Sequence, residues 1–350
     1  MTSIDVGAPV PATAAWQGYA RAVTVWLGAA LVAFALGGIL VLIAGGSPVD
    51  SLRAMFQGAL GSVFSVGQLL VLAIPLLVIG LGLAVAFRGR VYNIGAEGQL
   101  FMGALAGGAL LLTIDGDGRL MIGLALVAGT VGGALWGAIV GVLRARWGVN
   151  EVISSLLLTY IALFIFGWAI RRPFGDPSAG NNLASRPIPE DTLLGTLPDL
   201  FVHYGLFVAI ALVPVVGYVM ARTPFGFRVR AMGLNLAATE VAGVRTGRLV
   251  IWLMLVSGGL AGLAGIIQVV GIEGRLDAGI SQSYGFTAIV VALLGRLNAF
   301  GVLLAALFIA FLNAGGQAMS VEEGLPYSIV LAIQGVFVLL VLVADRFSRV

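Results

Sequence analysis

Long runs of apolar residues without any alternation are the feature that most limits what this chain can fold into. A stretch of about 20 apolar residues crosses the hydrocarbon core of a bilayer as a helix, and several runs here reach that length. A membrane β-barrel requires strands in which apolar and polar residues alternate. Because backbone groups in lipid must be hydrogen-bonded within the protein, the sequence predicts an all-α integral membrane protein.

Composition points the same way. The chain has 350 residues, of which 60% are hydrophobic and 10% charged. Soluble domains carry about 25% charged residues, so this chain has too few charges to build a surface that faces water on all sides.

Ten spans are predicted after a short cytoplasmic tail of residues 1–22, so that residues 23–350 form one transmembrane domain. The spans are 23–44, 67–87, 96–114, 120–143, 152–170, 204–221, 250–271, 284–294, 301–316 and 327–343. The eighth is too short to cross alone and is expected to belong to a broken or tilted helix preceded by residues 281–283. Apart from two long loops, the remaining segments are interpreted as short connectors.

Arginine placement indicates the orientation. With the N-terminus inside, thirteen of the 19 basic residues fall in inner loops, and most acids fall in outer loops. This agrees with the positive-inside rule, and an even number of spans puts both termini in the cytoplasm. The long loop 171–203 is then external and the long basic loop 222–249 is cytoplasmic.

The order of the spans predicts an inverted repeat. The set of spans two to five begins on the outside, and the set of spans seven to ten begins on the inside. If the two sets have similar folds, they are inverted relative to each other. Such repeats are common in transporters and place the pathway at their interface. Residues 93–100 and 271–276 are weakly similar in sequence, as this relation would predict.

Missing residue types exclude several kinds of chemistry. The chain has no cysteine and one histidine, His203, so a thiolate metal site is excluded, a histidine metal cluster is not expected, and no cofactor is predicted. All 19 basic residues are arginine. A Walker A loop requires a lysine to hold ATP phosphates, so the chain is not expected to be an enzyme, and any ATP hydrolysis must come from another chain.

Two stripes of small residues predict close helix packing. Gly129, Gly133, Gly137 and Gly141 recur every fourth residue in the fourth span, and Gly258, Ala261, Gly262 and Gly265 form a similar stripe in the seventh. Small residues on one face let helix backbones approach closely in membranes.

Polar residues at the start of the third span are candidates for function. Asn93, Glu97 and Gln99 lie at the expected mouth of this span. An acid inside a span usually faces a cavity or a partner, so Glu97 either faces a pathway or pairs with Arg88 or Arg90. Asn150 and Glu151 are interpreted as a helix start. Four further amides lie in predicted spans or directly beside one and either line a polar route or bond between helices; they are Gln268, Asn313, Gln317 and Gln334.

The inner loop contains a predicted short helix. Asn235 can cap a helix that runs through Ala237, Ala238 and Glu240 and stops near Gly243. A basic stretch precedes it. The helix either lies on anionic lipid or docks on a soluble partner.

Three segments resemble a known family. Asn-Ile-Gly-Ala-Glu-Gly-Gln at 93–99, Gly-Val-Asn-Glu-Val-Ile at 148–153 and Arg-Ala-Met-Gly-Leu-Asn-Leu-Ala-Ala at 230–238 resemble permeases of bacterial ATP-binding-cassette (ABC) importers for sugars, nucleosides and branched-chain amino acids. The resemblance runs from about the second span to the C-terminus. Residues 93–97 and 294–301 depart from the ribose-type pattern, which favours the branch that works with BMP-type nucleoside-binding lipoproteins.

The resemblance implies an importer subunit in the bacterial plasma membrane, surrounded by lipid. Expected partners are cytoplasmic ABC ATPase subunits, a second permease subunit that is identical or paralogous, and an extracellular or periplasmic solute-binding protein; nucleic acid is not expected. The family's coupling helix falls on the inner loop, where the residues expected to contact the ATPase are Arg230, Gly233, Asn235, Ala237, Ala238, Glu240 and Gly243.

A nucleoside would need a route with amide and hydroxyl partners and apolar walls. The route is expected between the inverted halves, lined by Asn93, Glu97, Gln99, Gln268, Tyr284 and Asn313. Three alternatives stay open: import of a sugar such as ribose or another small polar solute, an ion-coupled secondary carrier, for which Glu97 is the available buried acid, and a membrane scaffold without transport.

Overall fold

The computed structural model of the chain describes residues 28, 31–178 and 183–348. The predicted tail 1–22 and the start of the first predicted span lie outside the described residues. The chain divides into two compact units, one formed by Met1–Gly58 with Gly315–Val350 and the other by Ala59–Ala314.

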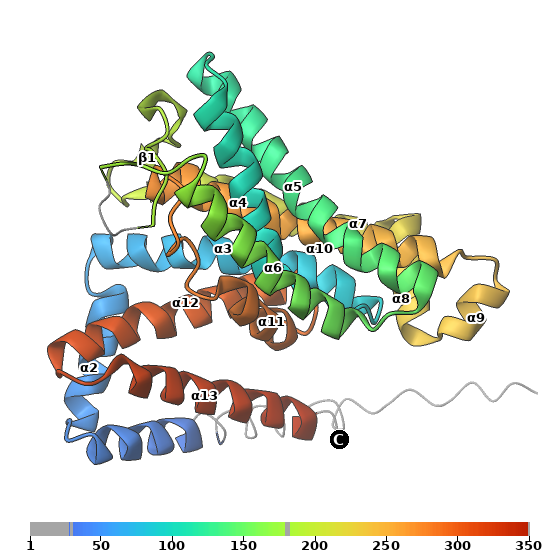
Figure 1. The fold of residues 1–350 in the computed structure, drawn as a ribbon. Coiled ribbons are helices and arrows are strands. Elements are labelled where there is room, and N and C mark those ends of the chain that lie inside the picture. The colour runs from blue at the N-terminus through green and yellow to red at the C-terminus, as the bar shows by residue number, and fades with distance from the viewer. Residues whose placement is uncertain (1–27, 29–30, 179–182, 349–350) are drawn as a thin grey trace, which may run out of the picture. The chain divides into compact units, whose positions relative to one another are not determined.

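The larger unit is built from long apolar helices, most of them joined by short turns (Figure 1). Its long helices are α3 (Val63–Arg88), α4 (Ala96–Thr113), α5 (Gly118–Trp147), α6 (Glu151–Arg171), α7 (Gly205–Arg222) and α10 (Thr246–Gln268). Shorter ones are α8 (Pro224–Leu234), α9 (Leu236–Val241), the π-helical turn η2 (Val269–Glu273) and α11 (Tyr284–Leu294). Helix α12 (Ala299–Glu322) begins in this unit and ends in the other.

Helix α10 is the centre of the larger unit. It packs against α3, α4 and α5, while α4 also contacts α6, and α3 contacts α7 and α11. The two glycine stripes meet at the contact between α5 and α10: a Cβ atom on Gly262 would lie 2.8 Å from the Cα of Gly133. The predicted close packing is therefore confirmed, because only hydrogen atoms fit between these backbones.

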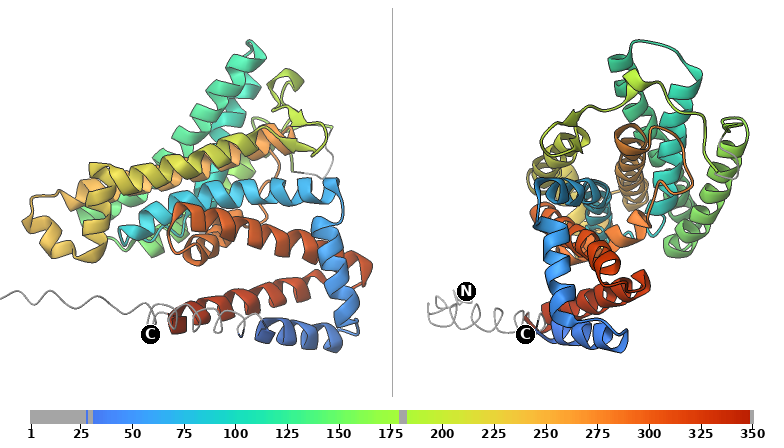
Figure 2. Two further views of the ribbon diagram at one scale, coloured as in Figure 1. Left: turned by 180° about the vertical axis from the view of Figure 1, so that it is seen from behind. Right: turned by 90° about the vertical axis from the view of Figure 1, so that its left-hand side faces the viewer.

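Loops and short elements lie at opposite ends of the larger unit (Figure 2). At one end, residues 172–204 include the 3₁₀ turn η1 (Glu190–Thr192) and the antiparallel strands β1 (Thr196–Leu197) and β2 (Val202–His203), paired Thr196 to His203 and Leu197 to Val202. This loop bonds to the chain that follows α10, because the Ser185 amide donates to the Leu276 carbonyl at 2.8 Å and the Leu194 amide donates to that of Val270 at 2.7 Å. At the other end lie α8 and α9.

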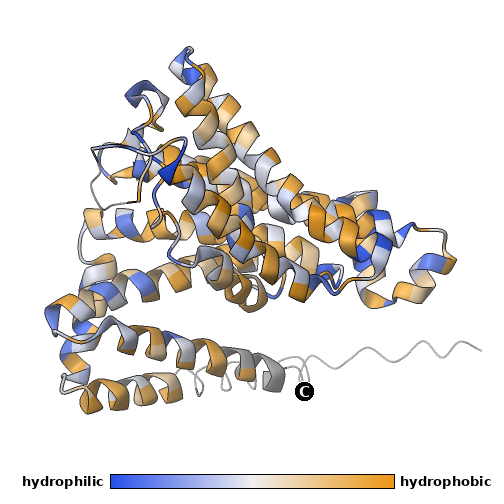
Figure 3. Ribbon diagram, in the orientation of Figure 1, coloured by the Kyte–Doolittle hydropathy of each residue, from blue (hydrophilic) through white to orange (hydrophobic). Residues whose placement is uncertain are grey.

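Hydropathy follows this arrangement. In the larger unit, hydrophilic segments gather at the end with β1 and at the end with α8, and the helices between are mainly hydrophobic (Figure 3). Among the described residues, seven helices are long and apolar enough to cross a membrane. They coincide with seven of the ten predicted spans, so the all-α membrane fold is confirmed.

The other three predicted spans take different forms. The first corresponds to a helix Leu31–Ile43 that forms a bent pair with α2 (Pro48–Leu60), with an angle of 111° between them. The eighth and tenth correspond to shorter apolar helices, Tyr284–Leu294 and Tyr327–Leu340 within α13 (Tyr327–Ser348). Interpreting 45–66 as a connector was wrong: Pro48 starts a helix there, since proline is tolerated in a first helical turn.

The smaller unit has its own apolar core, formed by Val41, Ala54, Met319, Leu325 and Val330. The rings of Phe34 and Phe337 meet edge to face with centroids 5.0 Å apart. Beside this core, the backbone amide of Ser47 donates to the Glu323 carboxylate at 3.4 Å.

Candidate functional site

A buried polar joint links α4 to α10. The Asn93 amide nitrogen donates to Gln99 Oε1 at 2.7 Å and to Ser257 Oγ at 2.9 Å. In return, Asn93 Oδ1 accepts from Gln99 Nε2 at 3.1 Å and from the Gly95 backbone at 3.0 Å. All three side chains are buried. Because donors and acceptors match so fully, the joint holds the turn before α4 in one conformation.

This joint lies beside the middle of a membrane-length helix. Ser257 is the twelfth of the 23 residues of α10. The neighbouring glycines place α4 alongside: Gly258 faces Gln99, and Gly262 faces Gly103. The segment 93–99 is therefore level with the centre of α10, rather than at the mouth of a span where the sequence alone suggested it lay.

Glu97 ties α4 to α11. Its carboxylate is 5% exposed and accepts a hydrogen bond from the Gly285 amide at 2.7 Å. The Ser281 hydroxyl is a second partner. Both helices begin here, so the carboxylate lies in the first turn of each, where the helix dipoles favour a negative charge. These partners replace the pairing with Arg88 or Arg90 that the sequence left open.

Gly285 is required for this contact. A Cβ atom at this position would lie 2.5 Å from the Cα of Glu97. Before it, Ser283 has a φ of +63°, and the Ser281 hydroxyl accepts from the Tyr284 amide at 3.1 Å. Ser281 and Gly285 were not among the predicted site residues, although the polar run that precedes an apolar stretch signalled a helix start.

The other predicted pathway residues are spread more widely. Tyr284 is buried beside the Glu97 contact, as the first residue of α11. Gln268 lies three turns beyond Ser257 on α10, buried, and its Oε1 has no hydrogen-bond partner among the described residues. Asn313 is half-buried on α12, and none of the contacts described joins it to the joint.

The segment predicted for coupling is a pair of helices. The expected cap is confirmed: Asn235 Oδ1 accepts from the Ala238 amide at 3.0 Å, and Gly243 ends the segment with a φ of +82°. Ala237, Ala238 and Glu240 are exposed on α9. The preceding α8 was not predicted; Thr223 caps it by accepting from the Gly226 amide at 3.2 Å.

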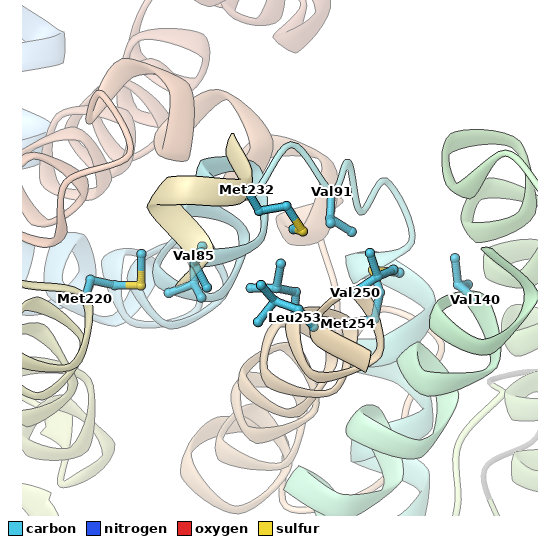
Figure 4. Close-up of a cluster of buried hydrophobic side chains, with 10 residues drawn as sticks. Val85, Val91, Val140, Met220, Met232, Val250, Leu253 and Met254 are labelled. Carbon is cyan, nitrogen blue, oxygen red and sulfur yellow. The ribbon is translucent and has the colours of Figure 1, made fainter. Parts of the chain in front are cut away.

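Helix α8 is anchored to the bundle by apolar side chains. Met232 and Val229 of α8 belong to a buried cluster with Val85 of α3 and with Leu253 and Met254 of α10 (Figure 4). Gly233 packs against the Arg88 carbonyl so closely that any side chain there would collide with it. Arg230 is half-buried. A load on α9 would therefore pass through α8 into α3 and α10.

A second joint, missed by sequence reasoning, lies at the same end. Glu151, interpreted as part of a helix start, forms an ion pair with Arg144 and accepts from the Tyr92 amide at 3.4 Å. Asn150 does cap α6, accepting from the Val152 amide at 2.9 Å. Glu151 thus connects α5, the turn before α4, and α6.

A cavity of about 1160 Å³ opens elsewhere in the larger unit. Residues of α7, α8 and α10 form most of its lining, and none of the six predicted pathway residues contributes. Among the described residues, no group of three or more acidic or histidine side chains could hold a metal ion.

Comparison with known proteins agrees with this architecture. Residues 65–344 match the family model described as "Branched-chain amino acid transport system / permease component". A glucose ABC transporter permease protein, TsgB13 of Haloferax volcanii, is 36% identical over 96% of this chain and 90% of its own length. The guanosine ABC transporter permease protein NupP of Bacillus subtilis is 32% identical over 89% of this chain and 91% of its own.

The nucleoside ABC transporter permease protein NupB of Lactococcus lactis is also 32% identical, over 92% of this chain and 91% of its own length. No solved structure matches the chain. Since the family model covers most of the chain and the relatives align along nearly all of it, this protein belongs to the family of branched-chain amino acid transport system permease components.

Proposed function

We propose that this chain is the membrane permease subunit of an ABC importer that takes up nucleosides. The observation that carries the proposal is the alignment with guanosine and nucleoside permeases along about nine tenths of the chain. In this family the ATPase is a separate subunit, which agrees with the absence of lysine from the sequence. The departure of residues 93–97 and 294–301 from the ribose-type pattern supports the same solute class.

A second candidate solute is a hexose. The permease that is 36% identical over 96% of the chain is named for glucose. Both solutes are neutral and polar, so both suit a pathway that offers amides and hydroxyls rather than charges.

An uptake assay separates these solutes. The chain is expressed with the ATPase, sister permease and solute-binding candidates encoded near it, in a host without its own nucleoside uptake. Labelled guanosine should accumulate, and unlabelled guanosine should suppress the signal while glucose leaves it unchanged. Accumulation of labelled glucose instead would indicate that the imported solute is a hexose. Uptake driven by a proton or sodium gradient without ATP would favour the ion-coupled carrier, and a solute-independent ATPase rate would favour a scaffold.

The topology we propose has ten spans in a bacterial plasma membrane, with both termini in the cytoplasm. Seven full-length helices, one bent pair and two shorter apolar helices supply the ten. Arginines concentrate at the end with α8 and α9, which favours placing that end inside. An inverted repeat of α3–α6 and α10–α13 stays part of this proposal.

Because the chain contains no cysteine, single cysteines can report the topology directly. Glu190 in the 172–204 loop and Val241 on α9 are both exposed. In intact cells, a membrane-impermeant maleimide should label Glu190→Cys and should reach Val241→Cys only after permeabilisation. The reverse pattern would invert the topology.

The pathway is proposed to run past the first turns of α4 and α11, lined by Asn93, Glu97, Gln99, Gln268, Tyr284 and Asn313. The observation that supports it is the meeting of two helix starts beside the middle of α10. Broken helices that end at mid-membrane are typical of solute sites in transporters. The full pairing of Asn93 with Gln99 supports a structural role for those two, so Glu97 is the residue to test.

Glu97→Gln keeps an oxygen that can accept from Gly285 but removes the charge. If Glu97 meets solute, folded protein should be retained and the uptake rate should fall. If the charge is needed between the two helix starts, the amount of folded protein should fall instead. Unchanged uptake and unchanged folding would remove Glu97 from the pathway.

The coupling site is proposed to be α9 with the end of α8, docked on the cytoplasmic ATPase. The supporting observation is the anchoring of α8 between α3 and α10, which gives the exposed α9 a firm base. Ala237→Trp with Ala238→Trp should leave the permease folded, since both alanines are exposed, and should uncouple ATP hydrolysis from uptake. Normal uptake in this variant would contradict the assignment.

A further inference from the structure

The cavity of about 1160 Å³ is a groove between α7 and α10, closed at one end by α8. One face of each helix supplies a wall. Along α10 and the residue that precedes it, the wall residues recur at helical spacing; they are Arg245, Arg248, Leu249, Trp252, Leu255, Val256, Gly259 and Leu260. On α7 they are Leu212, Val215, Val216 and Val219. The larger unit alone forms the groove.

The groove exists because α7 and α10 diverge. Helix α7 packs mainly on α3 and α8. It approaches α10 at its first residue, where a Cβ atom on Gly205 would lie 2.7 Å from Ile267 Cγ2. From that contact toward α8 the two helices separate, and large aliphatic side chains line the gap.

Positive charge collects at the α8 end of the groove. Arg245 precedes the first residue of α10, Arg248 lies in its first turn, and Arg228 projects from α8; all three are exposed. A helix start already carries positive potential, so cations there are unfavourable unless an anion binds. The lining contains no carboxylate. Glu240 lies close by, where it accepts from the Thr246 hydroxyl at 2.7 Å, and one acid leaves the three arginines in excess.

Beyond the arginines the groove is apolar. Trp252 follows Arg248 by one turn and is 59% exposed. Tryptophan prefers the boundary between headgroups and hydrocarbon. From Arg248 to Leu260 the wall is about 18 Å long at about 1.5 Å per helical residue, and one leaflet of hydrocarbon is about 15 Å deep.

We propose that this groove holds one anionic phospholipid of the cytoplasmic leaflet, with its phosphate on Arg228, Arg245 and Arg248 and an acyl chain along α7 and α10. The proposal takes from the proposed function only the orientation that places α8 and α9 inside the cell. Guanidinium groups bind phosphate oxygens in pairs, and basic pockets between membrane helices on this side bind lipid headgroups. A zwitterionic lipid would leave the positive charge uncompensated.

The test measures the fluorescence of Trp252, whose side chain lines the groove. The full chain is reconstituted into phosphatidylcholine vesicles, and lipid with brominated acyl chains is added as either phosphatidylglycerol or phosphatidylcholine. The chain has six tryptophans, so the signal of Trp252 is the difference between the parent and Trp252→Phe. Brominated phosphatidylglycerol should quench this fluorescence at a much lower mole fraction in the vesicle than brominated phosphatidylcholine does.

Removing positive charge from the groove should weaken the preference for phosphatidylglycerol over phosphatidylcholine. Arg245→Gln with Arg248→Gln should reduce it about 30-fold, since each arginine near a membrane contributes about fivefold. The matched control is Arg146→Gln with Arg222→Gln, which removes two exposed arginines from outside the lining. The control should keep the preference of the parent.

Four results would overturn the proposal. The first is equal quenching by the two brominated lipids in the parent, and the second is an equal loss in the control and the groove variant. The third is an intermolecular disulfide formed by Trp252→Cys in this cysteine-free chain, which would show that a second copy covers the groove. The fourth is loss of quenching when purified ATPase subunits are added, which would assign the arginines to the ATPase. Quenching that persists after the ATPase subunits are added would support the lipid.

Discussion

Helix α10 has two faces that differ in packing: one is in close contact with neighbouring helices, and the other lines the groove. Gly258, Gly262 and Ser257 face α4 and α5, where backbones touch and the Ser257 hydroxyl accepts a hydrogen bond from Asn93. Gly259, three residues before Gly262, and Trp252 line the groove, where the nearest atom to a Cβ on Gly259 is Cγ2 of Thr130 on α5, 3.4 Å away. The difference shows that one glycine alone does not bring helix backbones together: Gly262 meets the glycines of α5, whereas Gly259 meets the side chains of Thr130 and Ala134.

The largest expected effect is on the packed face. Gly262→Ala would push a methyl group against the backbone of Gly129 and Gly133. Because neither backbone can rotate away, the cost should reach about 3 kcal/mol, the upper part of the range for overpacking. Gly259→Ala, one turn away on the groove face, should change little. Melting temperatures and the yield of monodisperse protein measure both, and equal losses would erase the distinction between the two faces.

The next effect concerns the polar joint of the same face. Asn93→Leu would leave Gln99, Ser257 and the Gly95 amide without their partners. Each buried polar group left unpaired costs about 1–3 kcal/mol, so three such groups at the low end of that range give a loss of about 3 kcal/mol, similar to that of Gly262→Ala. Trp252→Leu, in the groove, is the comparison and should remain near the parent in thermal stability. A stable Asn93→Leu protein would show that the joint does not hold α4 to α10.

His203 tests the place where the loop before α7 packs against the π-helical turn that follows α10. Its ring packs beside Gly205 and Gly271, is fully buried, and has no hydrogen-bond partner among the described residues. Burial lowers the pKa of His203 to about 4, from an ordinary value of 6.5. The unfolded chain therefore binds a proton before the folded one does, and stability should fall as the pH drops from about 6.5 toward 4.

The size of that loss is about 1.4 kcal/mol per pH unit at most. Melting temperature measured across this range should show the slope, and His203→Phe should flatten it, because a phenyl ring fills similar space and takes up no proton. Two observations would contradict the account: an unchanged slope in His203→Phe, or a parent protein that is most stable near pH 4.

The smallest effect is expected at the ion pair of the α8 end. Glu151→Gln removes a partner of Arg144, and both groups are partly exposed. Such pairs contribute about 0–1 kcal/mol, so melting should shift little. This pair sharpens the contrast with Arg245 and Arg248, which lack a carboxylate in the groove. Strong destabilisation by Glu151→Gln would mean that the contact between Glu151 and the Tyr92 amide holds the turn before α4.

The sequence by itself determined the class of fold and the position of most helices. Hydropathy depends on composition along the chain, so the amino-acid order alone located seven long apolar runs, the glycine stripes and the cap at Asn235. Short helices escaped this reasoning. Helix α8 is short and basic, and the amphipathic α2 follows a sharp bend, so neither has the apolar length that marks a span.

Tertiary structure decided what the polar residues do. Glu97 and Gly285 are 188 positions apart, and Asn93 and Ser257 are 164 apart, so no local pattern could pair them. The sequence placed an acid near arginines at a helix mouth, and packing placed it between two helix starts instead. The groove likewise depends on the angle at which α7 leaves α10. Hydrophobic length is a property of each segment, whereas the partner of a buried charge is set by which segments meet.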